Sequence, residues 1–398
     1  MQRTCRTTFS VAGVILAAAG TTICAAQSDR NGVLAPGTAR PRPVSIVLPA
    51  GVEMAELYDT GEVLETEWFQ EWHPICGTPS GAVDTPTLID QVIEHRRQFE
   101  DSTKTVIVDT AGGDGIAGGG INIVFSASAS VPASALAALA AVETYIQGLF
   151  SDPITVTISV SWQNMGSGVL GSTGSYYTSS TYTTARNGLF NGKDSNDIIQ
   201  NYLPSGSTIP VRYNGASTLV TNESIVYWTR ANYRATVGAV NGTAASMTFN
   251  SAFGWDFDPS NGVSGYSFRD VIAHEVGHAL GFVSRVDFGA SVTDMTALDI
   301  FRFQTTDGTG DYNPDSYAEW QIRPRLVDYN SPNDQHHSDL ITVEYKMSDG
   351  TPYQASHFRE QSANIGLMDP ALSPGQTFYP NYFKVSDVAM FDAIGYDN

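Results

Sequence analysis

Basic residues are scarce in this chain: 21 lysines and arginines stand against 41 aspartates and glutamates, which gives a formal net charge of −20. A nucleic-acid or anionic-membrane surface needs a basic face, so this balance argues against both kinds of partner. The acidic excess suits a soluble protein, and it could also attract divalent cations or basic substrates. With 42% hydrophobic and 11% aromatic residues, the composition is that of a globular protein and not of a disordered one.

Long hydrophobic runs are also lacking, and the one apolar stretch that stands out lies at the N-terminus. Arg3 and Arg6 precede an apolar core at residues 11–19, and residues 24–26 (Cys-Ala-Ala) supply small side chains at a plausible cleavage point. This order is typical of a secretory signal peptide, and the apolar core is too short to span a bilayer comfortably. A buried N-terminal helix is the alternative interpretation. We predict a signal peptide over residues 1–26 and a secreted product without a membrane anchor.

Cysteine is the third scarcity, with three in 398 residues. Cys5 and Cys24 lie in the predicted signal peptide, so only Cys76 is expected in the mature chain. A single cysteine excludes an internal disulfide, although disulfides are common in exported proteins. The mature protein must therefore depend on its core for stability, and Cys76 needs an explanation of its own.

The texture of the sequence changes near residue 105. Before that point, residues 27–50 are rich in Pro, Gly and Arg and indicate an extended arm, and a helix is expected at residues 87–99. After it, the apolar patterns predict strands at residues 105–108, 121–125 and 154–162 and a helix at residues 132–150.

A stretch rich in Ser, Thr, Tyr and Gly follows at residues 166–184. We expect loops and edge strands there, and the low charge also suits an exposed rim that faces a substrate. The order strand, helix, strand, then a β-rich middle and one later helix, predicts an α+β domain. Further on, an apolar strand is expected at residues 300–303, and a closing amphipathic helix is expected at residues 385–396.

Residues 267–281 read SFRDVIAHEVGHALG and predict a helix. Ser267 with Asp270 forms a start similar to a capping box, and Gly281 is a natural stop. His274 and His278 stand four residues apart, so both imidazoles project from one face with their Cβ atoms roughly 5–6 Å apart. Two nitrogens at that separation can bind one zinc ion at about 2.0–2.1 Å each.

Glu275 follows the first of these histidines, which places its carboxylate beside a bound metal and not on it. There it can act as a general base toward water and later return the proton to a leaving amine. A chance His-Glu-x-x-His match in a long chain is the plain alternative. The capped helix, the glycine three residues after His278 and the export signal favour a zinc site.

A catalytic zinc ion needs a third protein ligand and an open position. In the compact metzincin pattern, that ligand is a histidine three residues after the glycine, but Ser284 occupies this position here and is a poor zinc ligand. The residues leave three candidates open: Asp287, the pair His336/His337, and His357.

Residues 355–370, ASHFREQSANIGLMDP, resemble the segment of leishmanolysin-type metzincins that carries the third zinc histidine and then the methionine turn. The resemblance implies His357 as the third ligand and Met368 as an apolar floor beneath the metal. It implies a metzincin-like zincin domain, with a twisted mixed sheet, an active-site helix and an irregular C-terminal subdomain. The chain lacks the cysteine richness of the leishmanolysins, so family-level substrate details are not carried over.

Residues 73–80, HPICGTPS, resemble the cysteine switch of matrix-metalloprotease prodomains, in which a thiolate binds the catalytic zinc. The resemblance implies that Cys76 inhibits a zymogen, although Ile75 and Ser80 replace the charged residues of that motif. A buried structural cysteine is the alternative. We therefore expect a propeptide over residues 27–104 and a catalytic domain over residues 105–398.

These observations together predict a secreted zinc metalloendopeptidase that acts on proteins or peptides, with Glu275 as general base. The rival from another class is a secreted, non-enzymatic binding protein with a structural zinc site. A weaker prediction concerns the oxygen-rich loop at residues 307–315, which could bind Ca²⁺ but lacks the full spacing of a known calcium loop. A plain turn is the simpler interpretation of that loop.

Overall fold

A computed structural model provides the structure of the chain. It describes residues 105–108, 120–165, 169–193, 199–213, 221–284, 295–303, 325–327, 335–337, 344–348, 353–359 and 364–398. All of them belong to one compact unit, Glu67–Asn398. The predicted signal peptide (residues 1–26) and propeptide (residues 27–104, with Cys76) lie outside the described residues, as do Asp287 and the loop at residues 307–315.

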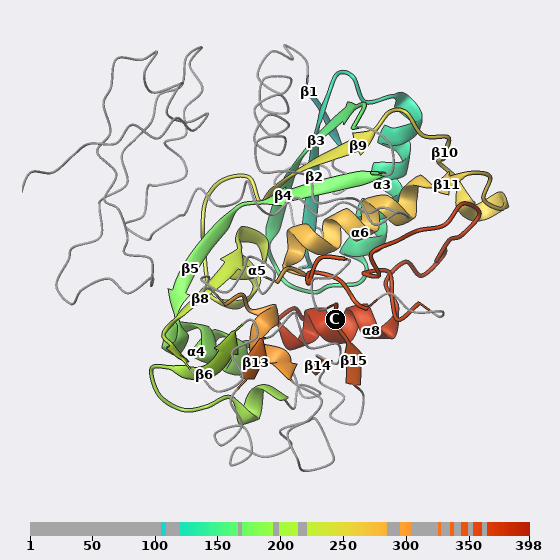
Figure 1. Ribbon diagram of the computed structural model, residues 1–398. Coiled ribbons are helices and arrows are strands. Elements are labelled where there is room, and N and C mark those ends of the chain that lie inside the picture. Colours follow the sequence, from blue (N-terminus) through green and yellow to red (C-terminus); the bar gives the residue numbers. More distant parts are fainter. Residues whose placement is uncertain are drawn as a thin grey trace, which may run out of the picture. The chain divides into compact units, whose positions relative to one another are not determined.

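A five-stranded sheet forms the frame of this unit (Figure 1). In spatial order its strands are β1 (Thr105–Val108), β2 (Asn122–Ser128), β3 (Thr155–Gln163), β9 (Ala245–Asn250) and β4 (Gly171–Ser175). Strands β2, β3 and β9 run parallel, whereas β1 and β4 run antiparallel to their neighbours. The sheet is therefore mixed, and Figure 1 shows its twist. The predicted strands at residues 105–108, 121–125 and 154–162 are confirmed as β1, β2 and β3.

Two long helices pack on this sheet, and together with it they agree with the predicted α+β class. Helix α3 (Ala133–Gln147) packs on β2, helix α6 (Phe268–Leu280) packs on β4, and the two helices contact each other. Pro132 caps α3, where its missing N–H group is no loss. The apolar residues of α3 recur every three or four positions and are buried, which gives the helix one core-facing side: Ala135, Ala138, Leu139, Val142 and Ile146.

The polar stretch after β3 is more ordered and more buried than its sequence suggested. It forms β4 at the sheet edge, then β5 (Tyr177–Thr181), and helix α4 (Tyr182–Gly192) begins within it. The expectation of an exposed rim is wrong for the described residues 169–180, which are buried except for Ser179. The physical reason is close packing, since a Cβ atom on Gly171 would stand 3.1 Å from Val271 of α6. Small uncharged residues are needed where a helix lies this close to the strand.

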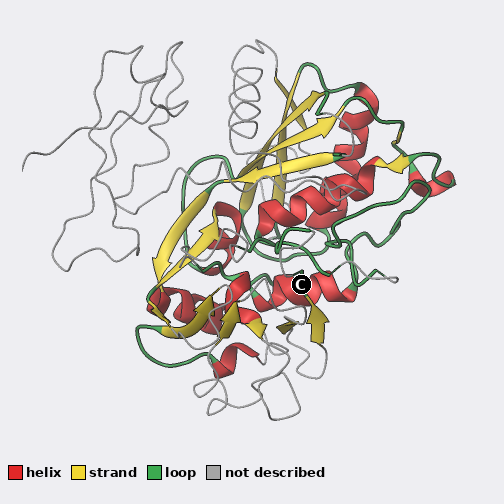
Figure 2. Ribbon diagram, in the orientation of Figure 1, coloured by secondary structure: helices red, strands yellow, loops and turns green. Residues whose placement is uncertain are grey.

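Shorter elements complete the unit (Figure 2). In chain order they are η3 (Ile199–Tyr202), β6 (Ile209–Tyr213), β7 (Thr221–Glu223), β8 (Ile225–Thr229), α5 (Arg230–Thr236), β10 (Trp255–Asp256), η4 (Pro259–Asn261), β11 (Tyr266–Ser267), η6 (Leu298–Phe301), β12 (Arg302–Phe303), β13 (Arg325–Val327), β14 (Gln335–His337), β15 (Glu344–Lys346) and α8 (Val385–Ala393). They form small ladders of two or three strands, namely β5-β8, β10-β11, β13-β6-β7 and β12-β14-β15. After Gly281 the described chain thus has only short elements until α8.

Two local expectations need correction. The strand expected at residues 300–303 begins as the 3₁₀-helix η6, and only Arg302–Phe303 is extended. The closing helix is confirmed as α8, but it is largely buried, and Val385 is its most exposed large residue at 69%. Within the described part of the chain, no helix is long and apolar enough to cross a membrane.

Candidate metal centre

Helix α6 carries two of the predicted ligands and is fixed by packing at its start and a glycine at its end. Phe268 is fully buried in an aromatic cluster, with ring centroids 4.8 Å from Phe249 and 4.9 Å from Trp255. At the other end, Gly281 has a φ of 121°, a conformation that favours glycine and stops the helix. The predicted helix and its stop are therefore confirmed.

The predicted capping box is not formed. Ser267 is the N-cap residue, but its side chain caps no backbone N–H group, and its hydroxyl donates to the Asp270 carboxylate instead. Asp270 also accepts hydrogen bonds from the Thr377 hydroxyl at 2.7 Å and the Phe378 N–H at 2.6 Å. The carboxylate thus joins the start of α6 to a segment far along the chain, and burial raises its pKa.

The structure brings His274 and His278 together with His357, which comes from the irregular segment of residues 353–359. The ring centroids are 4.7 Å apart for the two α6 histidines, and His357 lies 5.3 Å from His274 and 4.9 Å from His278. One ligand atom from each residue lies within 4.8 Å of the others, and all three side chains are buried. This set can hold a metal ion.

The outer ring nitrogens of the three histidines determine which nitrogens face the centre. Each Nδ1 lies at hydrogen-bond distance from a backbone carbonyl oxygen: Leu367 at 2.8 Å for His274, Phe282 at 2.7 Å for His278, and Gln354 at 3.2 Å for His357. A carbonyl oxygen only accepts, so each Nδ1 must carry the proton and donate. The neutral ring then keeps its lone pair on Nε2, which is the form that binds a metal.

The distance between two of these Nε2 atoms supports a cation at the centre. His274 Nε2 and His278 Nε2 lie 2.9 Å apart. If both Nδ1 atoms carry protons, two neutral rings would point lone pairs at each other, which is unfavourable. A cation between the lone pairs removes that repulsion, so the residues present fit a bound metal ion.

Glu275 follows His274 on α6, and its carboxyl is fully buried against the edge strand β4. Its Oε2 accepts a hydrogen bond of 2.6 Å from the Thr173 hydroxyl, while Oε1 has no hydrogen-bond partner among the described residues. Burial raises the pKa of Glu275 well above its ordinary value, and the bond from Thr173 partly opposes this. Thr173 was not singled out in the sequence, since a threonine in the run GSTGS carries no distinctive signal.

Met368 lies directly beneath α6. The side chain is fully buried, and its Sδ would stand 2.5 Å from a Cβ atom at Gly277, the glycine between the two α6 histidines. The neighbouring backbone serves the ligands, because Leu367 C=O accepts from His274 and Met368 C=O accepts from the Phe358 N–H at 2.9 Å. Met368 therefore packs against α6 at Gly277, and its role beneath a metal ion stays a prediction.

Asp387 of α8 holds this turn and was missed in the sequence. Its carboxylate accepts from the backbone N–H groups of Leu367 at 2.8 Å, Met368 at 3.0 Å and Lys384 at 2.7 Å. Burial raises its pKa to about 6, although the three backbone hydrogen bonds act to lower it. The only sequence signal was an acidic residue within an apolar helix.

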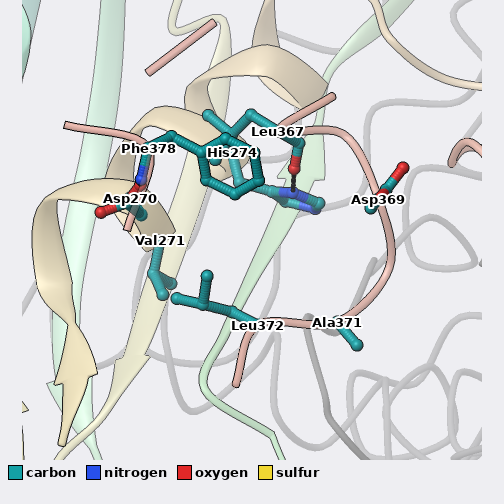
Figure 3. Close-up of a pocket in the computed structure, with 8 residues that line it drawn as sticks. All are labelled: Asp270, Val271, His274, Leu367, Asp369, Ala371, Leu372 and Phe378. Atoms are coloured by element: carbon teal, nitrogen blue, oxygen red, sulfur yellow. Dashed lines mark hydrogen bonds between the residues drawn. The ribbon is translucent and has the colours of Figure 1, made fainter. Parts of the chain in front are cut away.

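A small pocket adjoins the triad at His274 (Figure 3). It lies between the first half of α6 and the chain after Met368, and Figure 3 shows the hydrogen bond from His274 to Leu367 at its edge. The lining residues are Asp270, Val271, His274, Leu367, Asp369, Ala371, Leu372 and Phe378. The cavity volume is about 10 Å³, which is room for one water molecule and too little for a side chain.

The other candidates for the third ligand are described by their backbone alone or lie outside the described residues. His336 and His337 belong to β14, where they pair with Tyr345 and Glu344 of β15. Asp287 lies outside the described residues. Within the described ranges, the three histidines are the one group that could hold a metal ion.

Comparisons of the chain with protein-family models, curated proteins and solved structures find no match. Function must therefore be argued from the residues of the site.

Proposed function

We propose that this protein is a secreted zinc-dependent endopeptidase with a metzincin-like fold, similar to the leishmanolysins. The observation that carries the proposal is the convergence of three buried imidazoles that could hold one metal ion, with Glu275 directly after the first of them in sequence. Proteins and peptides are the substrates that this chemistry would serve.

The donor set favours zinc among the metals that bind imidazole. Imidazole nitrogen also suits copper, iron and nickel, so the three histidines alone leave the metal unspecified. Three protein ligands with a fourth position open are typical of catalytic zinc, and the fixed Nδ1 partners of all three rings are typical of its supporting shell. A bound zinc ion would polarise a peptide carbonyl and lower the pKa of a water molecule at the site.

Glu275 would move the proton in this reaction. Thr173 occupies Oε2, so Oε1 is the oxygen available to take a proton from water and return it to the leaving amine. Burial raises the pKa of this carboxyl, which makes it a stronger base than an exposed carboxylate. Met368 would provide the apolar floor beneath the centre, as the family resemblance implies.

The N-terminal part of the proposal rests on sequence alone. Residues 1–26 would direct export, residues 27–104 would form a propeptide, and Cys76 would inhibit the zymogen through its thiolate. A calcium ion at residues 307–315 belongs to the same group of proposals.

The decisive experiment compares zinc content and casein proteolysis for the wild type, Glu275→Ala and His357→Ala, each with and without residues 27–104. We expect Glu275→Ala to retain zinc and lose roughly 10²–10⁴-fold in activity, as removal of a general base does. His357→Ala should lose both. His336→Ala is the matched control and should retain both. Zinc retention and activity in His357→Ala would make Asp287 the ligand to test.

One observation favours a second candidate, a binding protein with a structural zinc site. All three histidines and Glu275 are buried, and structural metal sites are usually closed. A structural site also takes a fourth protein ligand, and no such group joins the triad among the described residues. Wild-type protein that binds zinc but cleaves nothing, with or without residues 27–104, would move this candidate ahead.

A further inference from the structure

Ser284 has an unexpected partner. It occupies the position at which the compact metzincin pattern has its third histidine, and in the structure it meets Ser356, the residue before His357. The Ser284 N–H donates to Ser356 Oγ at 2.8 Å, and the Ser356 hydroxyl donates back to the Ser284 carbonyl oxygen at 3.3 Å. Both residues are fully buried, so one side chain joins the loop after α6 to the segment that carries the third histidine.

A buried carboxylate fixes Ser284 from the other side. The Ser284 hydroxyl donates to Asp299 Oδ1 at 2.5 Å, and Asp299 Oδ2 accepts from the Thr296 N–H at 3.0 Å. Asp299 is fully buried on η6. Hydrogen bonds to a carboxylate are roughly twice as strong as bonds between neutral groups, so Ser284 is held firmly.

Arg302 fixes the backbone on both sides of Ser356. Its guanidinium is fully buried and donates to the carbonyl oxygens of Ala355 at 3.2 Å and Ser348 at 2.7 Å. The Ser348 N–H in turn donates to the His357 carbonyl oxygen at 2.9 Å. The backbone is therefore tied to one buried cation directly at Ala355 and, through Ser348, at His357.

The segment around His357 needs such ties because it contains no helix and no named strand. Its described residues, 353–359, form turns and bends with a single bridge between Phe358 and Met347. A metal site requires its ligands to be held within about 0.5 Å of their working positions. Regular structure provides this precision for His274 and His278, but not for His357.

We propose that Ser284, Asp299, Arg302 and Ser356, here called the clasp, position His357 as the third metal ligand. This inference rests on the metal centre of the proposed function and adds residues that touch no metal. The clasp acts through the backbone of the ligand, so it sets metal affinity and not only stability.

The test measures metal affinity for five forms of the full chain: wild type, Ser356→Ala, Ser356→Thr, Ser284→Ala and Ser161→Ala. Zinc affinity is obtained by competition with a chromophoric chelator, and the visible absorption of bound Co²⁺ reports the coordination geometry. Ser161→Ala is the matched control, since that buried serine bonds Thr248 at 2.9 Å between β3 and β9.

We expect Ser356→Ala to weaken zinc binding by about 10- to 100-fold, the range typical of groups that orient metal ligands. Ser284→Ala should have a smaller effect, because the backbone groups that bond Ser356 remain. Ser161→Ala should keep wild-type affinity. Ser356→Thr retains the hydroxyl and should restore much of the affinity.

The outcomes separate the two proposals. Wild-type affinity in Ser356→Ala, or an equal loss in Ser161→Ala, would overturn the clasp while the metal centre stands. If Ser356→Ala does not fold, as thermal unfolding of the metal-free form would reveal, Ser284→Ala against Ser161→Ala decides. Zinc binding without proteolysis would defeat only the endopeptidase, whereas a wild type that binds no metal would defeat both.

Discussion

Helix α6 and the segments at residues 353–359 and 364–370 each supply part of the candidate metal centre, but different forces hold them. Helix α6 is fixed by its own backbone hydrogen bonds and by apolar packing around Phe268. The two later segments contain no helix or named strand and are fixed by buried polar groups such as Arg302 and Asp387. Two ligands therefore depend on packing, whereas the third depends on hydrogen bonds between distant residues.

The largest effect is expected from Phe268→Ala, which removes the apolar packing that fixes α6. The change leaves a cavity among Phe249, Trp255 and Phe257 and should lower the free energy of unfolding by about 3–5 kcal/mol. The metal affinity of the folded form should stay near that of the wild type. Denaturant unfolding measures the free energy of unfolding, and zinc titration measures the metal affinity. A parallel fall in both would show that packing around Phe268 also sets the metal affinity.

Asp387→Asn weakens the hydrogen bonds that fix the segment at residues 364–370. The amide retains one acceptor oxygen, so at least one of the N–H groups of Leu367, Met368 and Lys384 loses its acceptor. We expect the free energy of unfolding to fall by about 1.5–3 kcal/mol. Zinc affinity should fall by about 10-fold, because the Leu367 carbonyl orients His274. Asp258→Asn, at an exposed loop, is the control for loss of one carboxylate.

Gly277→Ala tests the contact between α6 and Met368. The new methyl group would collide with Met368 and should destabilise the protein by about 1–3 kcal/mol through overpacking. In the double variant with Met368→Ala, the loss of stability should be smaller than the sum of the losses in the two single variants. The shortened side chain at residue 368 leaves room for the new methyl group. Thermal unfolding of the two single variants and the double variant forms the cycle, and strict additivity would contradict the contact.

The smallest effect is expected from Thr173→Val, which changes the environment of Glu275 but no ligand. Loss of the hydroxyl should lower kcat about 10-fold, or about 1.4 kcal/mol in activation free energy, with zinc affinity and KM unchanged. Thr173→Ser retains the hydrogen bond and should remain close to the wild type. Steady-state kinetics with a peptide substrate distinguish these forms, and equal losses in both would assign Thr173 a packing role.

Much of helix α6 and of the five-stranded sheet was predictable from the sequence. The helix at residues 267–281, its stop at Gly281 and the shared face of His274 and His278 follow from local spacing, which the structure retains. The strands at residues 105–108, 121–125 and 154–162 follow from apolar patterns of the same local kind.

Helix α4 was missed because its sequence, YTTARNGLFNG, is polar and carries no clear apolar period. Its N-cap did leave a signal, since Thr181 accepts a hydrogen bond from the Thr184 N–H. The capping box expected at Ser267 and Asp270 had a local pattern, but the structure does not form it. A distant segment, through Thr377 and Phe378, binds the Asp270 carboxylate, and no local pattern reveals that competition.

The segments at residues 353–359 and 364–370, which hydrogen bonds fix, were predictable only in part. Residue types and spacing left Asp287, His336/His337 and His357 open, and only the leishmanolysin resemblance favoured His357, which the structure places in the triad. Ser284 and Ser356 have no local signature, because they bond each other across 72 residues. The bond of Asp387 to Lys384 is local, but its bonds to Leu367 and Met368 are not. Such pairings depend on the completed fold.

Asp387, which holds the turn at Leu367 and Met368, is made near the end of synthesis. Translation proceeds from the N-terminus, so His274 and His278 leave the ribosome well before His357, and Asp387 follows later still. Of the three described histidines, a chain that ends before His357 contains only the two on α6. The full affinity of the site therefore arises late, when α8 has been made and can close on the turn.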